Sequence, residues 1–170
     1  QEEQRGTGHA VLQAREYLAA MEGYVYVLAG DMPLLATATL RALGQRAQGR
    51  AGALLCALLE DPTGYGRVLK DEQGLALGIV EHKDATPQQL ALGEVNASVY
   101  CFDAAKLLAA LACLTPENAQ GEYYLTDCVA HLRAQGKEVA VLQATDPREC
   151  LGVNSLKQLN EVALLLNKQK

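Results

Sequence analysis

One short run of residues combines an acidic side chain with a backbone that a ligand can approach. Gly30-Asp31-Met32-Pro33 directly follows Tyr24–Ala29, whose apolar and aromatic residues predict a strand. Ligands of open α/β sheets bind at the carboxyl ends of the strands. A carboxylate there can ligate Mg²⁺, which takes oxygen ligands and keeps water and substrate phosphates in its shell. Gly30 lets a ligand come close to the backbone. The alternative is that Asp31 belongs to an ordinary solvated turn.

A second candidate is the turn Gly6-Thr7-Gly8-His9, which precedes a predicted helix over residues 8–22. The backbone N–H groups of such a turn suit an anion or the edge of a flat base. The run is neither a Walker loop nor a G-x-G-x-x-G motif. An ordinary helix start, with His9 in its first turn, is the alternative.

Other polar groups stand at the ends of predicted elements or inside them. Glu81-His82-Lys83-Asp84 closes a predicted strand and could supply a general acid–base pair, or be a solvated strand end. Asn96 lies in the apolar pattern of a strand over 95–102, where a buried amide needs partners, so it is a candidate ligand. Asn154 precedes the last predicted helix and could simply cap it.

The elements that must position these residues alternate between strand and helix. Helices are predicted over 8–22, 40–48, 103–111, 124–135 and 155–167, and strands over 24–29, 53–59, 68–70, 75–81, 95–102 and 139–142. This alternation predicts an α/β fold with a mixed, mostly parallel sheet flanked by helices. The two strands within 68–81 are expected to form an antiparallel insertion.

Composition narrows the class of protein. The 170 residues are 49% apolar and 21% charged, as in one globular domain. The net charge of −5, without a basic stripe, argues against broad affinity for nucleic acid or anionic membrane. No apolar run approaches the roughly 18 residues of a membrane span, and no signal segment opens the chain. Five widely spaced cysteines without C-x-x-C are typical of reduced thiols, so we expect a cytoplasmic protein.

Four longer runs, in this order, resemble one family. They are QRGTGHA (4–10), DPTGYGR (61–67), IVEHKDAT (79–86) and NAQGEYYLTD (118–127). They resemble the uridylyltransferase domain of the bacterial bifunctional enzyme UDP-N-acetylglucosamine pyrophosphorylase / glucosamine-1-phosphate N-acetyltransferase. The Gly-Asp-x-Pro run at Asp31 specifies only the wider superfamily. The resemblance covers Gln1 to about Asn160. It implies a Rossmann-like nucleotidyltransferase domain over residues 1–154 and a terminal helix over 155–170.

The resemblance also implies a reaction. UTP and N-acetylglucosamine 1-phosphate would give UDP-N-acetylglucosamine and pyrophosphate, in the pathway to peptidoglycan and lipopolysaccharide. The sugar phosphate oxygen attacks the α-phosphorus in line, so catalysis is positioning plus charge neutralisation by Mg²⁺ and cationic side chains. A non-catalytic module that binds UDP-N-acetylglucosamine is the alternative. A glycosyltransferase is disfavoured because no Asp-x-Asp motif follows residues 24–29.

The family's motifs assign roles to matching positions of this sequence. The implied catalytic residues are Asp31 and Lys83, the latter beside a phosphate. The implied Mg²⁺ ligands are Asp31 and Asn154. The implied nucleotide contacts are Gln1, Gly6, Thr7, Ala29, Gly30 and Asp31. The implied sugar contacts are Gly66, Glu81, Asn96, Tyr124, Thr126 and Asn154.

The sequence departs from the family's pattern at both ends and at a few internal positions. It lacks the Gly-rich loop L-A-A-G-x-G-T-R-M, which clamps the triphosphate, and the C-terminal β-helix that forms trimers and carries the acetyltransferase. We therefore expect an N-terminally truncated piece of a homotrimeric protein, with little activity of its own. Arg5 replaces an aliphatic residue, Ala97-Ser98 replaces Thr-Gly, and Leu156 replaces an arginine.

Overall fold

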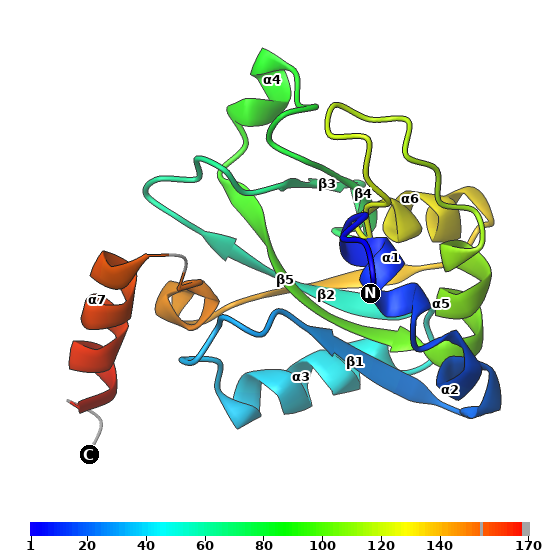
Figure 1. The fold of residues 1–170 in the computed structure, drawn as a ribbon, viewed down its shortest axis with the longest axis horizontal. Helices are drawn as coiled ribbons and strands as arrows, with labels where there is room; N and C mark the ends of the chain where they lie inside the picture. Colours follow the sequence, from blue (N-terminus) through cyan, green and yellow to red (C-terminus); the bar gives the residue numbers. More distant parts are fainter. Residues whose placement is uncertain (154, 168–170) are drawn as a thin grey trace.

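The structure is a computed structural model that describes residues 1–153 and 155–167. Within these residues six strands form one sheet, with helices on both faces (Figure 1). The strands are β1 (Tyr24–Leu28), β2 (Gly52–Leu58), β3 (Arg67–Lys70), β4 (Ala76–Val80), β5 (Glu94–Asp103) and β6 (Val139–Gln143). The helices are α1 (Thr7–Leu12), α2 (Arg15–Ala20), α3 (Thr37–Ala47), α4 (Pro87–Leu90), α5 (Ala104–Leu111), α6 (Asp127–Ala134), α7 (Leu156–Asn167) and the 3₁₀ helix η1 (Pro147–Cys150).

Strand β2 explains why the sheet has a core on each face. Successive side chains of a strand point to opposite faces, and an apolar run such as Gly52–Leu58 therefore needs cover on both. Leu54 and Cys56 pack in one core with α5 and α6, whereas Ala53 and Leu55 pack in the other with α3. Within the described ranges, none of the helices is long and apolar enough to cross a membrane.

The sheet is mixed, as expected, but its pairing corrects the prediction of a mostly parallel sheet. The strand order is β4-β3-β5-β2-β6, with β1 also paired to β5. Of the pairings between described strands, only β2–β6 is parallel. Strands β1, β2, β3 and β6 do run in one direction, but β5 lies between them and runs the opposite way. Periodicity identifies strands and carries no signal of which strands become neighbours.

The predicted strands are present with ends shifted by no more than one residue, whereas the helices differ more. The expected helix over 8–22 is two helices, because Ala14 leaves helical geometry at φ −92° and ψ 11°. This break turns the chain so that Leu18 of α2 packs beside α5. The expected helix over 124–135 begins only at Asp127. The single turn α4 was not expected and is held by a Thr86–Gln89 capping box.

Strand β5 is kinked where it changes partners. Along one edge β5 pairs with β3 at Val95 and with β1 only from Val99 onward. Along the other edge its register with β2 shifts between Asn96 and Tyr100. Ser98 lies at this point with φ 55°, and no other non-glycine among the described residues has a positive φ. The kink opens the β5 edge between β1 and β3.

Candidate functional site

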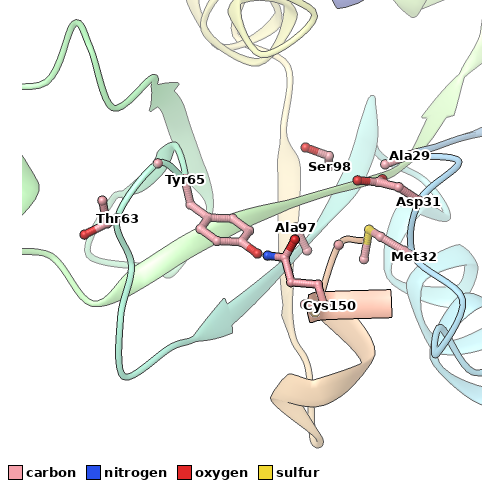
Figure 2. A pocket seen from close by; sticks show the side chains of 11 residues that line it. Ala29, Asp31, Met32, Thr63, Tyr65, Ala97, Ser98 and Cys150 are labelled. Carbon is pink, nitrogen blue, oxygen red and sulfur yellow. The ribbon is translucent and has the colours of Figure 1, made fainter. Parts of the chain in front are cut away.

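Asp31 lies where two adjoining hollows meet, next to the kink of β5. The first, of about 290 Å³, is lined by the turn 63–65 and by Ala97, Cys150 and Gly152. The second, of about 390 Å³, is lined among others by Thr7, Glu81, Tyr100 and Thr126. Ala29, Asp31 and Ser98 belong to both. Figure 2 shows Tyr65 across the first hollow from Asp31 and Ser98.

A hydrogen bond fixes the backbone of Asp31, whereas its carboxylate has no partner among the described side chains. The carbonyl oxygen of Asp31 accepts a hydrogen bond from the N–H of Val153 at 2.9 Å. No side chain among the described residues donates to the carboxylate or forms an ion pair with it. The space beside Gly30 is also open, because a Cβ built there would meet no atom within 4 Å. Asp31 can therefore bind a cation or a donor that enters the hollow.

The residues present fit a Mg²⁺ ion. Nowhere in ranges 1–153 and 155–167 do three His, Cys, Asp or Glu side chains gather to enclose a metal. Mg²⁺ does not need such a cage, since one or two protein oxygens plus water and substrate phosphates complete its octahedron. Asp31 supplies one such oxygen. The other predicted ligand, Asn154, lies outside the described residues, next to the Val153 that contacts Asp31.

The structure brings together the predicted sugar contacts Gly66, Glu81, Asn96 and Thr126. The Thr126 hydroxyl donates to Glu81 Oε1 at 2.9 Å, and the Asn96 N–H donates to the Gly66 carbonyl at 2.9 Å. A Cβ at Gly66 would lie 3.4 Å from Glu81 Oε2 and 3.0 Å from Ile79 Cγ2. Glu81 directly follows β4, Asn96 lies in β5, and Gly66 and Thr126 directly precede β3 and α6. The ends of these elements therefore gather the four residues into one wall.

The Glu81 carboxyl has an unusual electrostatic environment. Burial raises the pKa of Glu81, and the nearby charges of Asp127, Asp84 and Glu122 raise it further. The hydrogen bond from Thr126 opposes this rise in pKa because it stabilises the carboxylate. A carboxyl in such a place can exchange hydrogen bonds with the hydroxyl or amide of an uncharged ligand group.

Asn96 has internal partners that sequence reasoning did not specify. Its Nδ2 donates to the Tyr100 hydroxyl at 2.7 Å, and its Oδ1 accepts from the Ser98 N–H at 3.3 Å. Both Asn96 and Tyr100 are buried. The Asn96 side chain thus stabilises the kink of β5 around Ser98. One N–H and one lone pair remain for a ligand.

The predicted nucleotide contacts are split between two places. Thr7 lines the second hollow, and its hydroxyl accepts from the Leu125 N–H at 3.0 Å. The same segment is fixed by Tyr123, whose N–H donates to Arg5 O and whose carbonyl accepts from Gly8 N–H, both at 2.8 Å. Gln1 lies in a separate outer hollow, with its amide 2.9 Å from His9 Nδ1. The structure therefore does not bring Gln1 into either hollow around Asp31.

Lys83 and Tyr124 line neither hollow around Asp31. The Lys83 ammonium donates to Gln120 Oε1 at 2.7 Å, and Gln120 Nε2 donates to the Tyr124 hydroxyl at 2.8 Å. The Lys83–Gln120 contact therefore ties the turn after β4 to the segment before α6, and Tyr124 holds Gln120 within that segment. The role of Lys83 beside a phosphate stays a prediction.

Tyr65 and Ser98 are lining residues that sequence reasoning did not assign. Tyr65 stands between two glycines, and an aromatic ring in such a turn is a signal that could have been used. Serine itself does not favour positive φ, but Ser98 stands where the resembled family usually has glycine, and that departure is the signal that could have been used.

Comparison with known proteins decides the family. Residues 1–147 match the family described as Nucleotidyl transferase. The chain belongs to the nucleotidyl transferase family. It is 48% identical over 172 residues to the bifunctional protein GlmU of Solibacter usitatus, covering 100% of this chain and 37% of that protein. It is 49% identical over 168 residues to the bifunctional protein GlmU of Heliobacterium modesticaldum, covering 98% and 37%. The chain thus spans just over a third of the length of these relatives.

A solved structure supports the fold of this nucleotidyl transferase chain. The nucleoside-diphosphate-sugar pyrophosphorylase of Vibrio cholerae superposes with a TM-score of 0.57 and 14% identity, covering 82% of this chain and 57% of that one. The predicted nucleotidyltransferase fold and enzyme class are confirmed. Asp31 lies in the turn after β1, as the sequence predicted, and its role in binding a ligand stays a prediction.

Proposed function

We propose that the protein carries a uridylyltransferase site that joins UTP and N-acetylglucosamine 1-phosphate into UDP-N-acetylglucosamine, with release of pyrophosphate. The observation that carries the proposal is the place of Asp31, an unpaired carboxylate among the described residues, at the junction of two hollows. The wall with Glu81 and Thr126 adjoins it on one side. The relatives named bifunctional protein GlmU support the same assignment.

In the proposed reaction an oxygen of the sugar phosphate bonds to the α-phosphorus of UTP, and the bond from this phosphorus to the bridging oxygen of pyrophosphate breaks. No side chain need form a covalent bond, so the chain's work is to hold both substrates in line. Gly66, Glu81, Asn96 and Thr126 would hold the sugar, and Gly6, Thr7, Ala29 and Gly30 the nucleotide. Asp31, with Asn154, would hold Mg²⁺, which neutralises phosphate charge when bound.

The second candidate is a module that binds UDP-N-acetylglucosamine without making it. Gly66, Glu81, Asn96 and Thr126 lie together in the described part of the chain, which supports this candidate, because such a wall alone could retain the product. The two candidates differ in whether ligand binding requires Mg²⁺. A transferase must neutralise the charge of the phosphates during the reaction, whereas a module that binds the product through its sugar need not.

The test is calorimetric titration of the 170-residue chain with UDP-N-acetylglucosamine, with and without MgCl₂. We expect Mg²⁺-dependent binding that is lost in Asp31→Asn and kept in Glu72→Gln, a matched change at an exposed carboxyl outside both hollows. Pyrophosphate release from UTP and N-acetylglucosamine 1-phosphate is measured in parallel. Metal-independent binding without turnover would replace the transferase by the binding module, and absence of binding would refute both.

A further inference from the structure

Arg67, the first residue of β3, is a charged side chain that the proposed chemistry does not use. It is 2% exposed and is the largest fully buried side chain among the described residues. Burying a guanidinium removes it from water at a high cost unless partners compensate. Within the described part of the chain no carboxylate pairs with it, and its Nε has no hydrogen-bond partner. Charge pairing therefore does not explain its place in the interior.

The partners of Arg67 are backbone carbonyls of two segments. Nη1 donates to the carbonyl oxygens of Pro62, at 2.9 Å, and of Tyr65. Nη2 donates to the carbonyl of Leu90, the last residue of α4, at 3.4 Å. The planar guanidinium has several donors in fixed directions, so it can bind a turn and a helix end at once. A single lysine ammonium cannot reproduce that geometry.

The turn that Arg67 holds is one wall of the hollow at Asp31. Tyr65 N–H donates to Pro62 O at 3.2 Å, which closes the turn, and Thr63, Gly64 and Tyr65 line the hollow. Figure 2 shows Tyr65 on the side opposite Asp31. The next residue, Gly66, accepts from Asn96 N–H at 2.9 Å. Arg67 thus holds the turn from the protein interior while the ligand would contact its outer side.

We infer that Arg67 is a positioning residue that fixes the turn 62–66, and with it the side of the hollow lined by Thr63, Gly64 and Tyr65, at the distance from Asp31 that the ligand requires. The inference rests on the proposed function for the identity of that ligand. Its physical basis is pre-organisation. Because the guanidinium already holds the turn in place, no conformational entropy is lost in ordering the turn when the ligand binds. Without Arg67 that loss would weaken the affinity for the ligand.

The test compares Arg67→Lys and Arg67→Met with the control Arg133→Met. Arg133 of α6 pairs with Asp71 in the same β3–β4 region, and it lines neither hollow at Asp31. Affinity for UDP-N-acetylglucosamine with MgCl₂ is measured well below each melting temperature, so that only folded protein is compared. We expect roughly tenfold or greater loss in Arg67→Met, a smaller loss in Arg67→Lys, and unchanged affinity in Arg133→Met. Unchanged affinity in folded Arg67→Met would overturn the inference.

Hydrogen exchange gives a second measurement that does not depend on the ligand. In the unmutated chain the amides of Tyr65 and Asn96 should be protected, and this protection should fall in either Arg67 variant and persist in Arg133→Met. If the Tyr65 and Asn96 amides of the unmutated chain exchange as fast as those of an unstructured peptide, Arg67 does not hold the turn and the inference fails. This outcome is measured on the unmutated chain alone, so it can be obtained even if neither Arg67 variant folds. If the chain binds no UDP-N-acetylglucosamine while the exchange pattern holds, the proposed function fails and the role of Arg67 in fixing the turn stands.

Discussion

The N–H of Val153 donates a hydrogen bond to the carbonyl oxygen of Asp31 at 2.9 Å, which joins the segment before α7 to the segment after β1. The two residues are 122 positions apart in the sequence, and Gly152 beside this contact lines the same hollow as Asp31. The contact fixes the backbone of Asp31 without using its carboxylate. The proposed metal site thus depends on two segments that meet only in the folded protein.

Val153→Pro removes this N–H and should weaken Mg²⁺-dependent binding of UDP-N-acetylglucosamine. A hydrogen bond of this kind contributes about 1 kcal/mol, so we expect a loss of roughly fivefold. Val153→Ala keeps the N–H and is the matched control, which should bind as the unmutated chain does. Calorimetric titration of the three proteins is the measurement. Equal affinities would show that the contact does not support the site.

Ser98→Gly should stabilise the protein. Ser98 adopts φ 55°, a conformation that strains a residue with a Cβ and suits glycine. We expect a gain of about 0.5–1 kcal/mol, reduced by the greater freedom of glycine in the unfolded chain. Thermal unfolding measures it as a rise of roughly 2 °C. Ser98→Ala keeps the Cβ and removes the hydroxyl, so it should not show the gain; an equal rise in both variants would mean that the backbone strain is not the cause.

Gly8→Ala should destabilise the protein. A Cβ at Gly8 would lie 2.4 Å from Leu114 Cδ1 and 2.9 Å from the Tyr123 carbonyl oxygen, so backbone and core would both have to shift. Such overpacking costs about 1–3 kcal/mol, measurable by urea unfolding. Gly93→Ala is the control, because its Cβ would meet Leu58 at an ordinary 3.4 Å. Equal stability of Gly8→Ala and the control would contradict the close packing of residues 5–8 on 122–125.

The sequence predicted the strands and the residues at their ends well because both signals are local. Runs such as Gly52–Leu58 are buried on both faces and read as continuous apolar segments. Asp31 comes two residues after the apolar run Tyr24–Ala29, so its place in the turn after a strand could be inferred. Strand pairing, the break at Ala14 and the contact of Val153 with Asp31 depend on long-range packing, which leaves no periodic signal. The roles of Ser98 and Arg67 could not be predicted for the same reason, since they come from the irregularity in β5 and from burial in the folded protein.

Glu81→Gln should change stability in a pH-dependent way. Burial raises the pKa of Glu81 in the folded state, above the value of about 4.3 for an exposed glutamate. Between the two values the folded protein holds the proton more readily than the unfolded chain, so stability falls as pH rises through this window. Glutamine carries no charge and avoids this loss. The variant should therefore unfold at a higher temperature than the unmutated chain at pH 8, and the difference should shrink toward pH 4.

Glu72→Gln, an exposed control, should show no such trend. A Glu81→Gln difference that grows as the pH falls would contradict the raised pKa, whereas weaker binding of UDP-N-acetylglucosamine by the stabilised variant would show that the buried carboxyl is kept for its ligand.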